Sequence, residues 1–169
     1  GRGVPKTRSY TLTNNDILRR IRYTFDLKDS AMIEIFASAD FKATEEQITT
    51  WLKKEEDDTF LQLSDTELAV FLNGFINFKR GKLDGEQPKP ESHLNNNMIF
   101  QKLRIALNLK AEDILDILQL ANFRLRKHEL SAFFRKPDNK NFRECKDQIL
   151  RNFLLGLQCQ LRPNHKDPE

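Results

Sequence analysis

The chain has 169 residues, of which 38% are hydrophobic and 31% charged, and its mean hydropathy is −0.64. No apolar run approaches the roughly 18 to 20 residues that cross a bilayer, so we expect no membrane association and a cytoplasmic location. Two cysteines, Cys145 and Cys159, are too few for a disulfide framework. Six glycines, six prolines and a near absence of valine argue against a sheet.

Apolar residues recur at helical spacing in eight segments. In chain order, the first four predicted helices cover about 15–25, 30–39 and 44–54 and the segment from 65 to about 80. The other four cover about 97–108, 112–120, 127–135 and 144–161.

Polar residues at the starts of these segments predict helix caps. Asn14 or Asn15 is expected to cap the first helix and Asp29 or Ser30 the second. The third and fourth helices begin with sequences typical of capping boxes, Thr44-Glu45-Glu46-Gln47 and Ser64-Asp65-Thr66-Glu67.

The segment 96–162 repeats the segment 14–80 without a gap, each residue being numbered 82 above its counterpart. Identical pairs make up about a quarter of the aligned positions, and such gapless register indicates two copies of one module. The pairs include Asn15/Asn97, Ile35/Ile117, Asp65/Asp147 and Gly74/Gly156. Glycine inside a helix costs roughly 1 kcal/mol relative to alanine, so the recurrence of Gly74 as Gly156 predicts a close helix contact.

The predicted fold is therefore all-α, with two homologous four-helix modules in tandem at 14–80 and 96–162. A module of about 67 residues is marginal alone, which favours a shared core about a pseudo-twofold axis. Residues 81–95, rich in glycine, proline and charge, are expected to form a linker. Residues 1–13 are expected to be a flexible arm or a remnant of the expression vector, and 163–169 a tail.

No catalytic or metal-binding motif is present. The histidines, His93, His128 and His165, are scattered, and there is no phosphate-binding glycine loop or nucleophile elbow. We predict no catalytic residues, no metal site and no cofactor, and expect a non-enzymatic binding or regulatory protein.

The segments 30–39, 40–43 and 44–54 have the size of a helix-turn-helix, and the arrangement recurs at 112–120, 121–125 and 126–136. Simple packing of short helices is the more ordinary explanation.

The two copies differ in charge. The first has 9 Lys or Arg and 13 Asp or Glu, whereas the second has 13 and 7. Basic residues of the second copy cluster around its third helix and the following loop, where phosphate can bind, and this predicts a nucleic-acid or partner surface. The cluster comprises Arg124, Arg126, Lys127, Arg135, Lys136, Lys140, Arg143 and Lys146.

Two alternatives remain open. The opposite charges can pair between chains, which would give a protein–protein scaffold or a homo-oligomer. Alternatively, a small ligand can bind at the module junction, where repeated polar residues meet if the axis is twofold. The candidates are Asn15, Arg22, Asn97 and Arg104, for which helix capping and surface ion pairs are the more ordinary roles.

Several stretches of the second copy carry a family resemblance. They are Asn95-Asn96-Asn97, Lys102-Leu103-Arg104-Ile105-Ala106, Leu109-Lys110 and Asn139-Lys140-Asn141-Phe142-Arg143-Glu144-Cys145, with Asp147-Gln148 and Leu150-Arg151-Asn152-Phe153-Leu154 after it. On these residues the chain resembles the YehS-like family, a small bacterial family catalogued as a domain of unknown function and duplicated within the chain. The resemblance implies a bacterial cytoplasmic protein and supplies no activity or site residues.

Overall fold

The computed structural model describes residues 11–163, and within them the secondary structure is helical without a strand. The first module contains α2 (Asn14–Thr24), α3 (Asp29–Ser38), α4 (Glu45–Trp51) and α5 (Asp65–Arg80). The second contains α6 (Asn96–Leu107), α7 (Ala111–Leu120), α8 (Lys127–Ala132) and α9 (Asp147–Leu161). The predicted all-α class and the two tandem modules are confirmed. The arm and tail predictions fall mostly on residues 1–10 and 164–169, outside the described range.

The third helix of each module is shorter than predicted. The helix expected over 44–54 ends at Trp51, and the one expected over 127–135 ends at Ala132. In each module the chain then turns and pairs with the end of that helix: the Leu61 N–H donates to the Thr50 carbonyl at 3.2 Å, and the Arg143 N–H to the Ala132 carbonyl at 3.1 Å. We call this segment the returning loop; it covers 52–64 in the first module and 133–146 in the second. Because of it, α9 begins at Asp147 and not at residue 144, as was expected.

The capping boxes at Thr44 and Ser64 are confirmed, with Gln47 and Glu67 as the reciprocal acceptors. The other two cap predictions are wrong. Thr13 caps α2, forming a box with Asp16, because the amides of Asn14 and Asn15 donate to carbonyls of the loop before α5 instead. Lys28 stands at the N-cap of α3 and makes no side-chain cap hydrogen bond.

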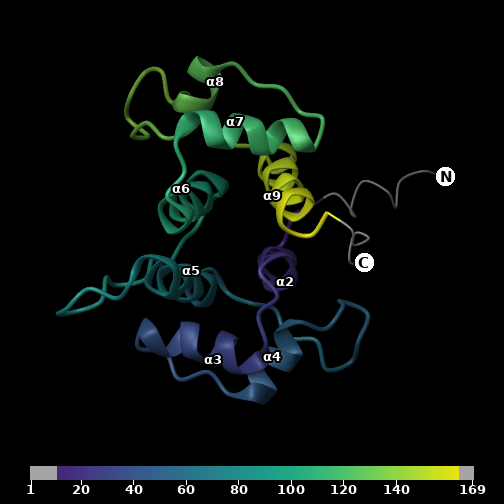
Figure 1. Cartoon of the computed structure of the whole chain (residues 1–169). Coiled ribbons are helices and arrows are strands. Elements are labelled where there is room, and N and C mark those ends of the chain that lie inside the picture. Colours follow the sequence, from purple (N-terminus) through teal and green to yellow (C-terminus); the bar gives the residue numbers. More distant parts are fainter. Residues whose placement is uncertain (1–10, 164–169) are drawn as a thin grey trace.

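The two modules pack through their first and last helices. Figure 1 shows α2, α5, α6 and α9 in the middle of the molecule, with α3 and α4 at one end and α7 and α8 at the other. Helix α5 packs on α6 and α2 packs on α9. Since α2 corresponds to α6 and α5 to α9 in the repeat, these two contacts are equivalent, as the predicted pseudo-twofold axis requires. A single apolar cluster, from Ile17 to Leu157, draws residues from both modules.

Within each module the last helix crosses the second helix closely at a glycine. A Cβ atom at Gly74 of α5 would lie 2.0 Å from the carbonyl oxygen of Ile35, and one at Gly156 of α9 would lie 2.0 Å from that of Ile117. No side chain fits at such a distance, so glycine sets the separation of α3 from α5 and of α7 from α9.

A carboxylate at the start of each last helix joins the modules. Asp65 accepts from the Asn14 side chain of its own module at 2.8 Å and from the Leu94 N–H, just before α6, at 3.0 Å. Asp147 accepts from Asn96 at 2.7 Å and from the Leu12 N–H, just before α2, at 3.1 Å. The two main-chain contacts, from Leu94 and from Leu12, therefore join the modules in equivalent ways.

Replacing Gly74 with alanine should destabilise the protein, although helix propensity alone predicts stabilisation by up to about 1 kcal/mol. Because the methyl group would press on the Ile35 carbonyl, we expect a loss of about 3 kcal/mol or more in urea denaturation. Gly156→Ala should lower the stability by a similar amount, because its methyl group would press on the Ile117 carbonyl. A stabilised Gly74→Ala protein would contradict the close crossing.

Asp65 should contribute a pH-dependent part of the stability. Partial burial acts to raise its pKa, but the hydrogen bonds from Asn14 and Leu94 outweigh burial, and the pKa lies below its ordinary value. A lowered folded-state pKa gives stability that is present above the unfolded-state pKa of about 3.9 and is lost as the pH falls through the folded-state value.

Asp65→Asn should therefore cost about 1 to 2 kcal/mol at pH 7, and the difference from the parent should shrink as the pH falls from about 5 toward 2. Urea titrations at several pH values measure this. Asp84→Asn, at an exposed linker position, is the control and should leave the profile unchanged. A constant difference across the pH range would contradict the role assigned to the carboxylate.

Candidate nucleic-acid interface

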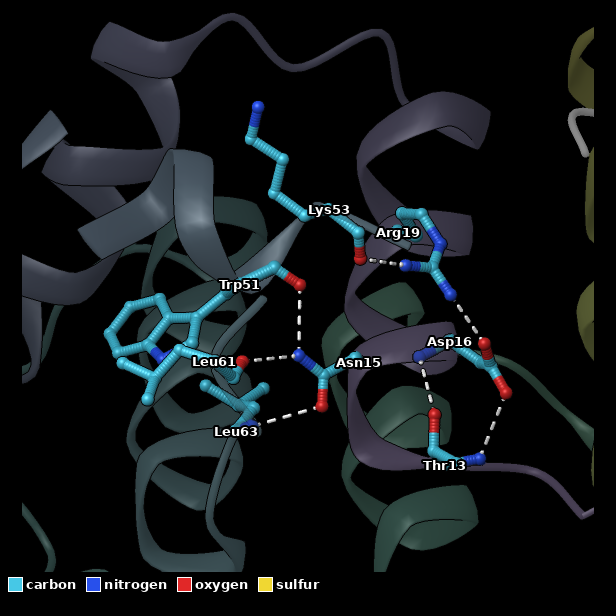
Figure 2. A network of polar contacts seen from close by, with 8 residues as sticks. All are labelled: Thr13, Asn15, Asp16, Arg19, Trp51, Lys53, Leu61 and Leu63. Carbon is cyan, nitrogen blue, oxygen red and sulfur yellow. Dashed lines mark hydrogen bonds and ion pairs between the residues drawn. The ribbon is translucent and has the colours of Figure 1, made fainter. Parts of the chain in front are cut away.

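A buried asparagine of the first helix holds the returning loop in each module. In the first module, Asn15 is 1% exposed and its Nδ2 donates to the carbonyls of Trp51 at 2.8 Å and Leu61 at 2.9 Å. Its Oδ1 accepts from the Leu63 N–H at 2.9 Å. Figure 2 shows these three bonds, all made to main-chain atoms.

Asn97 repeats the arrangement in the second module. Its Nδ2 donates to the carbonyls of Phe133 at 3.0 Å and Arg143 at 2.9 Å, and its Oδ1 accepts from the Cys145 N–H at 2.9 Å. Asn15 and Asn97, which were candidates for a junction site, thus direct their amides into the loops of their own modules.

The other two junction candidates differ from each other. Arg104 donates from Nε to the Leu109 carbonyl at 3.2 Å, and its guanidinium lies 4.7 Å from the ring centroid of Phe134. Arg22 instead lines a groove between the modules, together with residues that sequence reasoning did not name, such as Lys53 and Leu154. Other side chains also cross the junction, among them Arg20, which donates to Gln158 at 3.0 Å, and its counterpart Lys102, which donates to Asn73 at 2.7 Å.

The returning loop of the second module carries a basic groove. The groove has a volume of about 450 Å³ and lies between α8 and residues 140–143. Three of the eight predicted basic residues line it, namely Arg135, Lys140 and Arg143, together with His128, Glu129, Ala132, Asn141 and Phe142.

The main chain fixes the position of Arg143. Its N–H donates to Ala132, and its carbonyl accepts from Asn97. Leu61 makes the same two main-chain contacts in the first module and is 51% exposed. The two modules therefore present different side chains on one scaffold, arginine in the second and leucine in the first.

All eight residues of the predicted basic cluster are exposed. Lys127 and Lys146 form salt bridges, with Glu112 at 3.1 Å and Glu144 at 3.2 Å. Within residues 11–163, the other six form no salt bridge. The Arg126 N–H, 2.8 Å from Glu129, lowers the pKa of that carboxyl, and the charges of Arg126, His128 and Arg143 lower it further. We call the eight residues the basic face.

Cys145 precedes Lys146 of this face in the chain and is 2% exposed. Burial, with the nearby charges of Asp147 and Glu144, raises its pKa to about 12. The thiol is therefore protonated at neutral pH and packs where the first module has Leu63. Across the described residues, no three histidine, cysteine or acidic side chains gather as a metal site would require.

The predicted helix-turn-helix pair corresponds to α7 and α8. Helix α8 has six residues, which is less than two turns and about 9 Å long. None of the helices within residues 11–163 is both long and apolar enough to span a bilayer.

These features define a class of duplicated, all-helical protein, and comparison with known families places it. A family model described as "Protein of unknown function (DUF1456)" matches residues 14–81 and again residues 96–162. The chain belongs to this family, which confirms the resemblance found in the sequence.

One relative is the "Uncharacterized protein YehS" of Escherichia coli (strain K12). It is 47% identical over 151 residues, which cover 88% of this chain and 96% of the relative. No solved structure matches the chain.

Asn97→Ala should destabilise the protein by about 3 kcal/mol or more, because two carbonyls and one N–H would lose their partner in bonds that are buried or partly buried. Urea denaturation measures the loss. Asn139→Ala, in the same loop but at an exposed site, should cost less than about 1 kcal/mol. Unchanged stability in Asn97→Ala would contradict the structural role and return this residue to the candidates for ligand binding.

Proposed function

We propose that the protein binds nucleic acid through the basic face of the second module. The observation that carries this proposal is the groove beside α8, where Arg135, Lys140 and Arg143 are exposed and form no salt bridge with any residue in 11–163. Unpaired cations on a fixed scaffold attract phosphates, and their binding releases the counterions condensed on the nucleic acid.

The duplication supplies an internal comparison. The first module has the same loop scaffold, but only three of the eight positions remain basic there. The counterparts, in order, are Lys42, Thr44, Glu45, Lys53, Lys54, Asp58, Leu61 and Ser64. Because the fold is shared, folding does not require the basic residues of the second module. This difference favours a role in binding.

The short α8 favours contacts with phosphates over contacts with base edges. A recognition helix that reads the major groove presents several side chains along its length, and α8 has six residues. The groove is also lined by Phe142, a half-buried ring on which an unstacked base can pack. The expected target is therefore a single strand, bound with little sequence preference.

Fluorescence anisotropy of labelled single-stranded and duplex DNA and RNA, titrated over a salt series, tests this proposal. Binding should weaken with salt, and single strands should bind more tightly than duplexes. Arg135→Glu/Lys136→Glu should reduce affinity on the order of tenfold or more. Losing two phosphate contacts should reduce the slope of log K against log salt by about 1.4 for single strands.

The control is Lys42→Glu/Lys54→Glu, which makes the same change of charge at exposed positions of the first module. It should bind nearly as tightly as the parent. Equal losses in both variants would show that net charge alone drives binding. No binding at low salt would reject the proposal and direct the search to a protein partner for the charged modules.

A further inference from the structure

A second groove lies at the junction of the two modules, away from the basic face. It has a volume of about 640 Å³ and is bounded by α2, the end of α4 and α9. This volume is in the range of sites that bind small organic molecules, about 300 to 1,000 Å³. Five cationic side chains and two carboxylates line it, so the groove is positive. They are Arg19, Arg20, Arg22, Lys53 and Arg151, with Asp16 and Asp29.

A departure from the pseudo-twofold symmetry accompanies the groove. In the second module the Phe134 ring lies under Arg104, and the Arg104 Nε donates to the main chain. The counterpart of Phe134 in the first module is Leu52, which lines the groove. Arg22 is the counterpart of Arg104 in the repeat. Because Leu52 has no aromatic ring, Arg22 lacks the surface on which Arg104 packs.

Arg22 consequently differs from Arg104. It lines the groove, and its Nε–H is buried yet has no acceptor within residues 11–163. A buried arginine N–H without a partner costs free energy. A small shift of the Arg22 side chain toward the groove would let a bound anion supply the missing acceptor.

The rim of the groove is held in place before any ligand binds. Arg19 donates from α2 to the Lys53 carbonyl at 2.9 Å and also contacts Asp16 (Figure 2). This bond fixes the main chain of Lys53, whose ammonium lies 3.9 Å from Asp57 and forms no other salt bridge within residues 11–163. The main chain that carries Lys53 is therefore preorganised relative to α2, the helix that carries Arg22.

We propose that this groove binds a small organic phosphate. A dianionic phosphate matches the planar donors of Arg22 and the ammonium of Lys53. The apolar side chains of Leu12, Leu52 and Leu154 and the ring of Tyr23, which also line the groove, suit the organic part. The site is independent of the basic face, and neither proposal rests on the other.

Calorimetry and ligand-observed NMR with the full chain test this site. The probes are adenosine 5′-monophosphate and glucose 6-phosphate, with adenosine and glucose as their matched neutral parents. At least one phosphate should bind at least tenfold more tightly than its parent. Arg22→Gln should weaken that binding at least tenfold.

Leu52→Phe is a second variant, because it places in the first module the residue that the second module carries. It should also weaken binding at least tenfold while leaving the thermal midpoint within a few degrees. Arg143→Gln, in the groove of the basic face, should bind the phosphate as the parent does. Arg22→Gln should in turn bind single-stranded nucleic acid as the parent does.

Two results would overturn the proposal. One is the absence of binding by either phosphate at millimolar concentrations. The other is binding that Arg22→Gln and Leu52→Phe leave unchanged, because the phosphate would then occupy another part of the surface. Loss of nucleic-acid binding in the basic-face variant has no bearing on either result, so the two proposals fail separately.

Discussion

The arrangement of the whole molecule depends on the two carboxylates that begin the last helices, Asp65 and Asp147. Each accepts from an asparagine of its own first helix and from the main chain that enters the other module. Each aspartate therefore holds together three segments: the start of its own last helix, the start of its own first helix, and the chain that enters the other module. Since the same bonds occur twice, the modules must meet about an axis that relates them.

The axis and the glycine crossings together explain why the two copies kept one fold while their surfaces diverged. Gly74 and Gly156 set the helix separation within each module, and Asn15 and Asn97 hold each returning loop by main-chain atoms. These constraints involve buried or main-chain groups. The exposed positions of the loop are left to vary, and there the first copy has more acidic than basic residues and the second has more basic than acidic residues.

The sequence was sufficient to predict the fold class, the duplication and the close glycine contact, because helical periodicity and gapless repetition are properties of the chain itself. It gave the wrong caps for α2 and α3, because asparagine can cap a helix or bind a distant carbonyl, and only tertiary structure decides between them. The meeting of Arg135, Lys140 and Arg143 beside α8 could be predicted from spacing, because all three lie within nine residues of one another. A junction site with Arg22 was among the alternatives, but the rest of the groove could not be predicted, because it brings Arg22 and Lys53 together with Leu154, which is remote in sequence. The exchange of Phe134 for Leu52 was visible in the aligned repeats, but its effect depends on how Arg104 packs.

The loop held by Asn97 has a wider consequence. Because the asparagine binds only backbone atoms, the loop serves as a cassette whose outer residues can be exchanged between the modules with little effect on the core. A chain that carries two such cassettes can acquire a new specificity in one of them while the other is unaltered. In this respect the duplication works as antibody frameworks do, in which a constant support presents interchangeable loops. The protein thus offers a natural position for grafting recognition sequences.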